Sequence, residues 1–213
     1  MLRWPFRNTE GKSSDTYAAL EKILTLLESS PLYRPGFGVW AQACLSCYRG
    51  AKWDAAYYSL VERVFNCLAT EYPNYWPSED LLEAGIRTSE SLGNSQLAAE
   101  LAQRVAGKYS SWHDRTPSLA ITKSLKRIQT VCLRNRDVES IRSVLASIEK
   151  IRDLIPATSY QDLLELGVIA YSCSDNPDYA EALVLAMMEC GLIPRLVTLS
   201  GFFGLTHCYV VTH

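Results

Sequence analysis

The sequence has no long hydrophobic run and no catalytic signature. No stretch approaches the roughly 18 apolar residues that a membrane-spanning helix requires, so we expect no membrane span. The chain holds three histidines, two of them among its last seven residues, which leaves little for acid–base catalysis. No serine–histidine–aspartate arrangement, phosphate-binding loop or dinucleotide-binding fingerprint is present. We therefore expect that this chain is not an enzyme.

A second cysteine pair at metal-ligand spacing is missing as well. The seven cysteines are odd in number and scattered through apolar patterns, which is typical of buried reduced thiols rather than a disulfide framework. Cys44 and Cys47 form one CxxC motif, but no second pair follows, and the nearest histidine in sequence is His113. We therefore expect no metal and no cofactor.

Neither sign of charge is in large excess. The chain has 21 basic and 23 acidic residues, a net charge of -2 and a sequence pI near 6.0, so it has no overall attraction for nucleic acid. A hydrophobic content of 48% with a mean hydropathy of -0.04 is typical of a globular chain and not of a disordered one. Binding to nucleic acid would have to rest on local charge.

The chain does contain helix breakers at regular spacing. Five of its nine prolines follow one another at steps of 42, 40, 39 and 38 residues, at Pro35, Pro77, Pro117, Pro156 and Pro194. Weaker breaks rich in Gly, Asn and Asp divide the intervals again, at residues 48–53, 91–96, 133–138 and 173–178. A near-constant period of helix breakers indicates repeated units of two helices each.

Between the breaks, apolar residues recur three and four apart, as on one face of a helix. The stripe from Val138 to Ile155 is an example, and helix N-caps are expected at Ser78 and at Thr158 or Ser159. The predicted fold is all-α: a right-handed α-solenoid of antiparallel helix pairs, about four pairs plus flanking helices.

The expected organisation is an N-terminal segment, residues 1–14, that is disordered or truncated, followed by a single helical-repeat domain over residues 15–213. Its units are expected at about 36–76, 77–116, 117–155 and 156–193, with a partial unit at 194–213. The last helix would expose an apolar side, so we expect the C-terminal end to be covered by another element or chain. A fragment of a longer protein would have the same appearance.

The segment from Asp178 to Pro194 reads DYAEALVLAMMECGLIP: an alanine-rich helix with Met187 four residues before Gly191, and then a proline. The turn RGAKWDAA at residues 49–56 places a small residue before an apolar one and an alanine pair. These features resemble the pentatricopeptide repeat, at residue level over residues 156–198 and at the turn near Trp53. Units of about 40 residues lie nearer the period of HEAT-type repeats, which favours the general description of a pentatricopeptide-like or tetratricopeptide-like solenoid.

The resemblance implies binding of single-stranded RNA in a mitochondrion or chloroplast, with one base per repeat read by two side chains. It places base-reading positions near Ala41, Glu83, Lys126 and Gln161, and their partners in the links near Asn74 and Arg195. Alanine cannot hydrogen-bond a base edge and glutamate repels phosphate. The alternative interpretation is therefore that these are ordinary exposed helix residues.

Positive charge is concentrated between Lys123 and Arg152, where eight bases and three acids give a local charge of +5. An RNA backbone or an acidic protein would use such a segment, although a solvated helix face explains it equally well. The leading hypothesis is an organellar RNA-binding protein that acts in RNA processing, stability or translation. The alternative is a cytoplasmic scaffold of tetratricopeptide type that binds protein and no nucleic acid. The candidate RNA-binding residues are Lys123, Lys126, Arg127, Arg134, Gln161 and Arg195.

Overall fold

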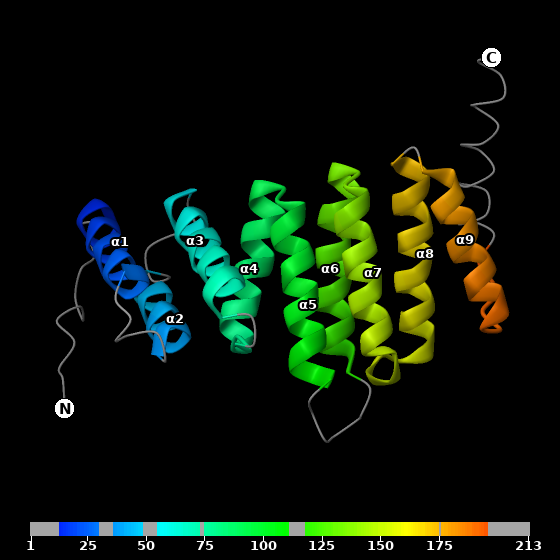
Figure 1. Ribbon diagram of the computed structural model, residues 1–213, viewed down its shortest axis with the longest axis horizontal. Coiled ribbons are helices and arrows are strands. Elements are labelled where there is room, and N and C mark those ends of the chain that lie inside the picture. Colours follow the sequence, from blue (N-terminus) through cyan, green and yellow to red (C-terminus); the bar gives the residue numbers. More distant parts are fainter. Residues whose placement is uncertain are drawn as a thin grey trace, which may run out of the picture. The chain divides into compact units, whose positions relative to one another are not determined.

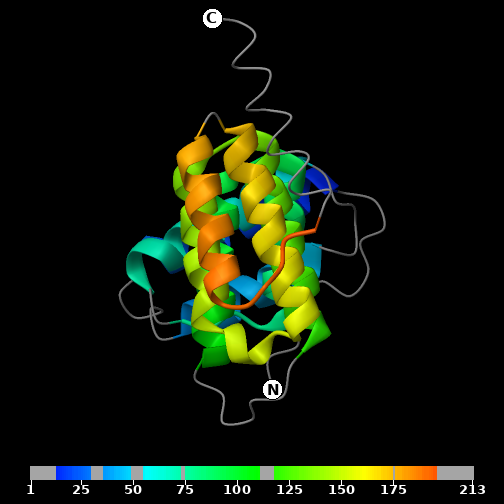
Figure 2. The ribbon, with the colours of Figure 1, turned by 90° about the vertical axis from the view of Figure 1, so that its right-hand side faces the viewer.

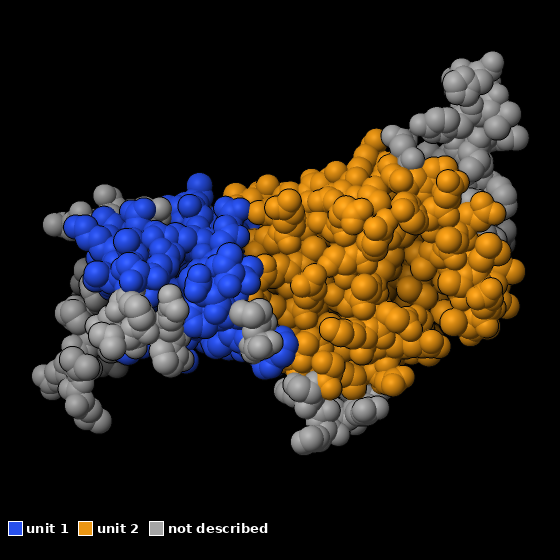
Figure 3. Space-filling view, viewed as in Figure 1, with its two compact units in different colours: residues 1–88 blue, residues 89–213 orange. Residues whose placement is uncertain are grey.

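The computed structural model describes residues 13–29, 36–48, 55–72, 75–110, 118–174 and 176–195. Throughout these ranges the regular secondary structure is helical (Figure 1). The expected all-α class is therefore confirmed for the described part of the chain. The chain divides into two compact units, residues 1–88 and 89–213 (Figure 3). The single repeat domain expected over residues 15–213 stays a prediction.

The α-helices and the one described 3-10 helix, η2, are these: α1 (Ser13–Ser29), α2 (Phe37–Tyr48), α3 (Ala55–Glu71), α4 (Glu79–Leu92), α5 (Ser95–Ser110), α6 (Leu119–Asn135), α7 (Val138–Lys150), η2 (Arg152–Leu154), α8 (Ala157–Cys173) and α9 (Pro177–Glu189).

Unit 1 is built on α1, α2 and α3, each of which contacts the other two. Its core contains fully buried large side chains such as Leu24, Phe37 and Phe65. The ring of Phe37 stacks on that of Tyr72, with centroids 5.3 Å apart. Burial of such side chains is the main driving force for folding.

Unit 2 contains α5 to α9, and its helices pack in a regular order (Figure 1). Helix α5 contacts α6 and α7, α6 contacts α7 and α8, α7 contacts α8, and α8 contacts α9. Figure 2 shows the last two helices side by side. Each helix therefore buries its apolar stripe against near neighbours in the sequence.

The predicted breaks at 91–96 and 133–138 are tight turns with the same chemistry. Gly93 after α4 and Arg136 after α6 both adopt the left-handed conformation, with φ of 63° and 53°. The residue that follows each caps the next helix: Asn94 Oδ1 accepts from Leu97 N at 2.9 Å, and Asp137 Oδ1 accepts from Ser140 N at 3.2 Å.

These two turns are also hydrogen-bonded to each other. The Asn135 amide donates to Gly93 O, and Ser95 Oγ donates to Asp137 Oδ2 at 2.6 Å. The Cys132 thiol lies 3.9 Å from Ser95 O. Contacts between residues about 40 apart in sequence thus tie the turn after α4 to the turn after α6.

Two details differ from the sequence-based expectation. The stripe from Val138 to Ile155 is not one helix, because α7 ends at Lys150 and η2 follows it. The expected N-cap at Ser78 is confirmed, since its hydroxyl accepts from Leu81 N at 3.2 Å. The expected cap at Thr158 or Ser159 is wrong: α8 starts at Ala157, directly after Pro156.

Candidate nucleic-acid interface

Helix α6 carries an exposed basic face. Lys123, Lys126 and Arg134 are all exposed and, at spacings of three, eight and eleven residues, lie on the same side of the helix. No acidic residue occurs between Ser118 and Arg136. Within the described part of the chain none of these three bases has an ion-pair partner. We call these three residues the α6 basic face.

The fourth candidate of α6, Arg127, lies in a different environment. Its guanidinium group is half-buried and binds Glu90 at the end of α4 through two hydrogen bonds, from Nε to Oε1 at 2.8 Å and from Nη2 to Oε2 at 2.6 Å. Such a fork matches the carboxylate in geometry and neutralises it. Arg127 therefore ties α6 to Glu90, which lies in the last turn of α4, where unit 2 begins.

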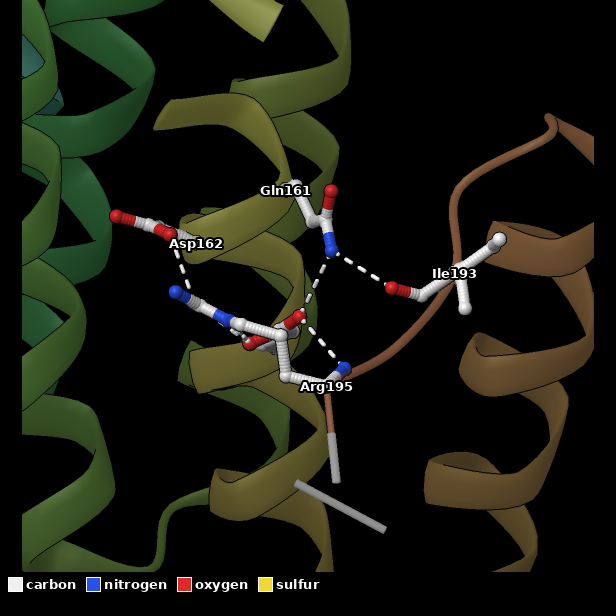
Figure 4. Close-up of polar contacts among 5 residues, drawn as sticks. Gln161, Asp162, Ile193 and Arg195 are labelled. Carbon is white, nitrogen blue, oxygen red and sulfur yellow. Dashed lines mark hydrogen bonds and ion pairs between the residues drawn. The ribbon is translucent and has the colours of Figure 1, made fainter. Parts of the chain in front are cut away.

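Arg195, which follows α9, is bound to α8 (Figure 4). Its Nε donates to Glu165 Oε2 at 2.7 Å, its backbone N–H donates to Glu165 Oε1 at 3.1 Å, and Nη2 donates to Asp162 Oδ1 at 2.7 Å. Glu165 is buried, and a buried carboxylate requires such a partner. The hydrogen bond to Glu165, followed by the attraction of its charge, raises the pKa of Arg195.

Gln161 belongs to the same network. Its amide Nε2 donates to Glu165 Oε1 at 3.0 Å and to Ile193 O at 2.8 Å (Figure 4). Gln161 and Arg195 thus fasten the chain after α9 onto α8. A nucleic acid that contacted either side chain would have to compete with these bonds.

The other positions implied by the resemblance also have structural neighbours. Ala41 is buried, and Glu83 accepts from Arg87 at 2.6 Å one turn later in α4. Asn74 lies outside the described residues, as do the side chains of Cys44 and Cys47. Buried or paired positions are poorly suited to reading bases.

The glutamates that bind these arginines were not identified from the sequence, although their spacing in the sequence could have indicated them. Arg63 in α3 binds Glu28 in α1 at 2.8 and 2.5 Å, 35 residues earlier, and Arg127 binds Glu90 37 residues earlier. Arg195 binds Glu165 30 residues earlier. In all three cases the arginine follows the glutamate that it binds by 30 to 37 residues.

Nowhere in the described ranges is a helix long and apolar enough to cross a membrane. Those ranges also contain no group of three or more His, Cys, Asp or Glu side chains that could hold a metal ion. Comparison with family models, with curated proteins and with solved structures finds no match for this chain.

Proposed function

We propose that this chain is a helical-repeat protein, a right-handed solenoid of antiparallel helix pairs similar to pentatricopeptide or tetratricopeptide arrays. Two observations support the proposal. Helices contact one another in a repeating order, α5 with α7 and α6 with α8. Polar contacts join residues separated by about one repeat, among them Ser95 to Asp137 and Arg127 to Glu90.

We further propose that the α6 basic face binds single-stranded RNA, in a protein of pentatricopeptide type that acts in RNA processing, stability or translation in an organelle. The observation that carries this proposal is the set of three exposed bases on a helix without acidic residues. Ammonium and guanidinium groups bind phosphate oxygens, which are common to every sequence.

The expected mode of binding is therefore contact with the RNA backbone rather than base reading. Gln161 and Arg195, which the resemblance would assign to base recognition, are engaged with α8. Backbone contact predicts an affinity that depends strongly on salt and weakly on RNA sequence.

The test is fluorescence anisotropy of a labelled single-stranded RNA of mixed sequence, titrated with the full chain over a salt series. We compare the double variant Lys123→Ala, Lys126→Ala with a matched control, Lys22→Ala, Lys150→Ala, which removes two exposed lysines from α1 and α7. The α6 variant should weaken binding and reduce the slope of log K against log salt by up to about 2. The control variant should bind like the parent chain.

A second candidate function, a tetratricopeptide-type scaffold that binds protein, is favoured by the net charge of -2 and by the internal pairing of Arg127 and Arg195. Absence of RNA binding at low salt, in a chain that circular dichroism shows to be helical, would contradict the RNA proposal and favour the scaffold. Equal losses in the two lysine variants would contradict a specific role for α6.

A further inference from the structure

Helix α9 is the least buried of the helices in unit 2. Two of its side chains, Ala180 and Met187, are buried, whereas α5 buries eight residues from Leu97 to Ala106. Leu185 and Met188 of α9 are 54% and 60% exposed. Single exposed leucines are common on protein surfaces, but Leu185 and Met188 lie three residues apart on the same side of α9, and it is the grouping of exposed apolar side chains that marks an interaction surface.

The same surface is acidic. Glu181 and Glu189 lie four residues before and after Leu185, and so share its side of the helix. Both are exposed, and neither has an ion-pair partner in the described part of the chain. No Lys or Arg occurs between Pro177 and Pro194. We call Glu181, Leu185, Met188 and Glu189 the α9 face.

We propose that the α9 face binds a basic amphipathic helix of a partner protein. An apolar stripe on that helix would cover Leu185 and Met188, and its Lys or Arg residues would bind Glu181 and Glu189. The chain itself already uses this combination. Helices α1 and α3 pack in contact with each other, and the Arg63–Glu28 pair joins them.

Charge decides between this partner and two others. RNA is disfavoured because carboxylates repel phosphate at close range. A second copy of the chain, bound through the same face by two-fold symmetry, would bring Glu181 and Glu189 of both copies together. A basic helix instead turns both carboxylates into attractive contacts, and helix-in-groove recognition of this kind relies on anchors at i, i+3 and i+4.

The test uses the full chain and a short synthetic peptide of leucine and lysine, with its leucines spaced three and four apart to form one apolar helix face. Two control peptides have the same composition in scrambled order, or glutamate in place of lysine. Binding is measured by fluorescence anisotropy, and the site is located by hydrogen exchange with mass spectrometry. We expect the patterned lysine peptide alone to bind and to slow exchange in α9.

Three variants separate the apolar from the electrostatic contribution to peptide binding. Leu185→Ser with Met188→Ser should weaken peptide binding about tenfold or more, since these are the apolar anchors. Glu181→Gln with Glu189→Gln should weaken binding at low salt and flatten its salt dependence. Leu119→Ser, which alters a 63% exposed leucine at the start of α6, is the matched control and should change nothing.

Binding of the scrambled peptide, protection outside α9, or an equal loss in the Leu119 variant would overturn the proposal. So would slow exchange of α9 in the free chain: if it varied with protein concentration it would indicate a second copy, and if it did not it would indicate a cover from within the chain. The α6 lysine variants should bind the peptide normally, so this inference can fail while the RNA proposal stands, and the reverse.

Discussion

Asp137 shows how much a single side chain can contribute to the stability of this chain. Its carboxylate accepts from Ser140 N, from Ser140 Oγ at 2.8 Å and from Ser95 Oγ at 2.6 Å. It therefore caps α7 and also joins two consecutive turns. Removing it leaves several hydrogen-bond donors without their acceptor, which costs more than the loss of an ordinary surface contact.

We expect Asp137→Ala to lower the free energy of unfolding by about 1–2 kcal/mol, measured by urea denaturation at neutral pH. Asp137→Asn is the control, because asparagine keeps a capping oxygen and loses only the charge. An alanine variant as stable as the parent chain would contradict the capping role.

The pH dependence of the Asp137 contribution follows from the direction of its pKa shift. The hydrogen bond from Ser95, helped by those from Ser140, lowers the pKa of Asp137 in the folded chain. The ionised carboxylate therefore adds stability at any pH above the unfolded pKa of about 4, and this is lost as the pH falls through the lower folded pKa. The stability difference between the parent chain and Asp137→Asn should shrink over that acidic range in urea titrations. A constant difference would contradict the assignment.

Two cysteines of unit 2 should differ in reactivity. Burial, with a smaller effect of the nearby Asp137, raises the pKa of Cys132 to about 12, whereas Cys190 is exposed after α9. Because the thiolate is the reactive form, Cys190 should be alkylated quickly at pH 8 and Cys132 only after unfolding. Peptide mapping by mass spectrometry measures both rates in one sample. Comparable rates in the native chain would show that the Cys132 site opens readily.

At the scale of elements, the residues of the turns after α4 and α6 determine where these helices end. The turns after α4 and α6 both need a left-handed residue, which glycine adopts freely and arginine does not. At Gly93 the nearest atom to an added Cβ is Asn135 Oδ1 at 3.6 Å, so a substitution there meets backbone strain and no clash.

Substitutions at the left-handed residues of the two turns should therefore have opposite effects on stability. Gly93→Ala should destabilise the chain by about 1 kcal/mol, and Arg136→Gly should stabilise it by about 0.5 kcal/mol after the greater freedom of glycine in the unfolded chain is included. Thermal and urea unfolding measure both changes. Changes of the same sign in the two variants would show that the turns are not equivalent.

At the scale of the whole molecule, stability should be distributed unevenly along unit 2. Helix α5 buries eight side chains and α9 buries two. Because hydrogen exchange reports local opening, amides of α5 should exchange far more slowly than those of α9 in the free chain. Mass spectrometry of exchanged peptides provides the measurement, and uniform protection across α5 to α9 would contradict it.

Much of the helical architecture follows from local rules. Gly93 and Asn94 predict a helix end and a new start whatever surrounds them, and Pro77 with Ser78 does the same before α4. The limits of these rules are visible after α7. The apolar stripe continues to Ile155, yet α7 ends at Lys150. The buried residues Ile151, Leu154 and Ile155 lie in or beside the 3-10 helix that precedes Pro156.

The amino-acid sequence alone indicated an all-helical chain with breaks at a period of about 40 residues and a concentration of positive charge between Lys123 and Arg152. It could not separate the bases that are exposed from those that are paired. Lys126 and Arg127 are adjacent in sequence, but one faces solvent and the other binds Glu90. Periodicity assigns a residue to a face of its helix, whereas its partner depends on which helix packs against that face and in what register. Packing between helices therefore determined which charges of this chain remain available to a ligand.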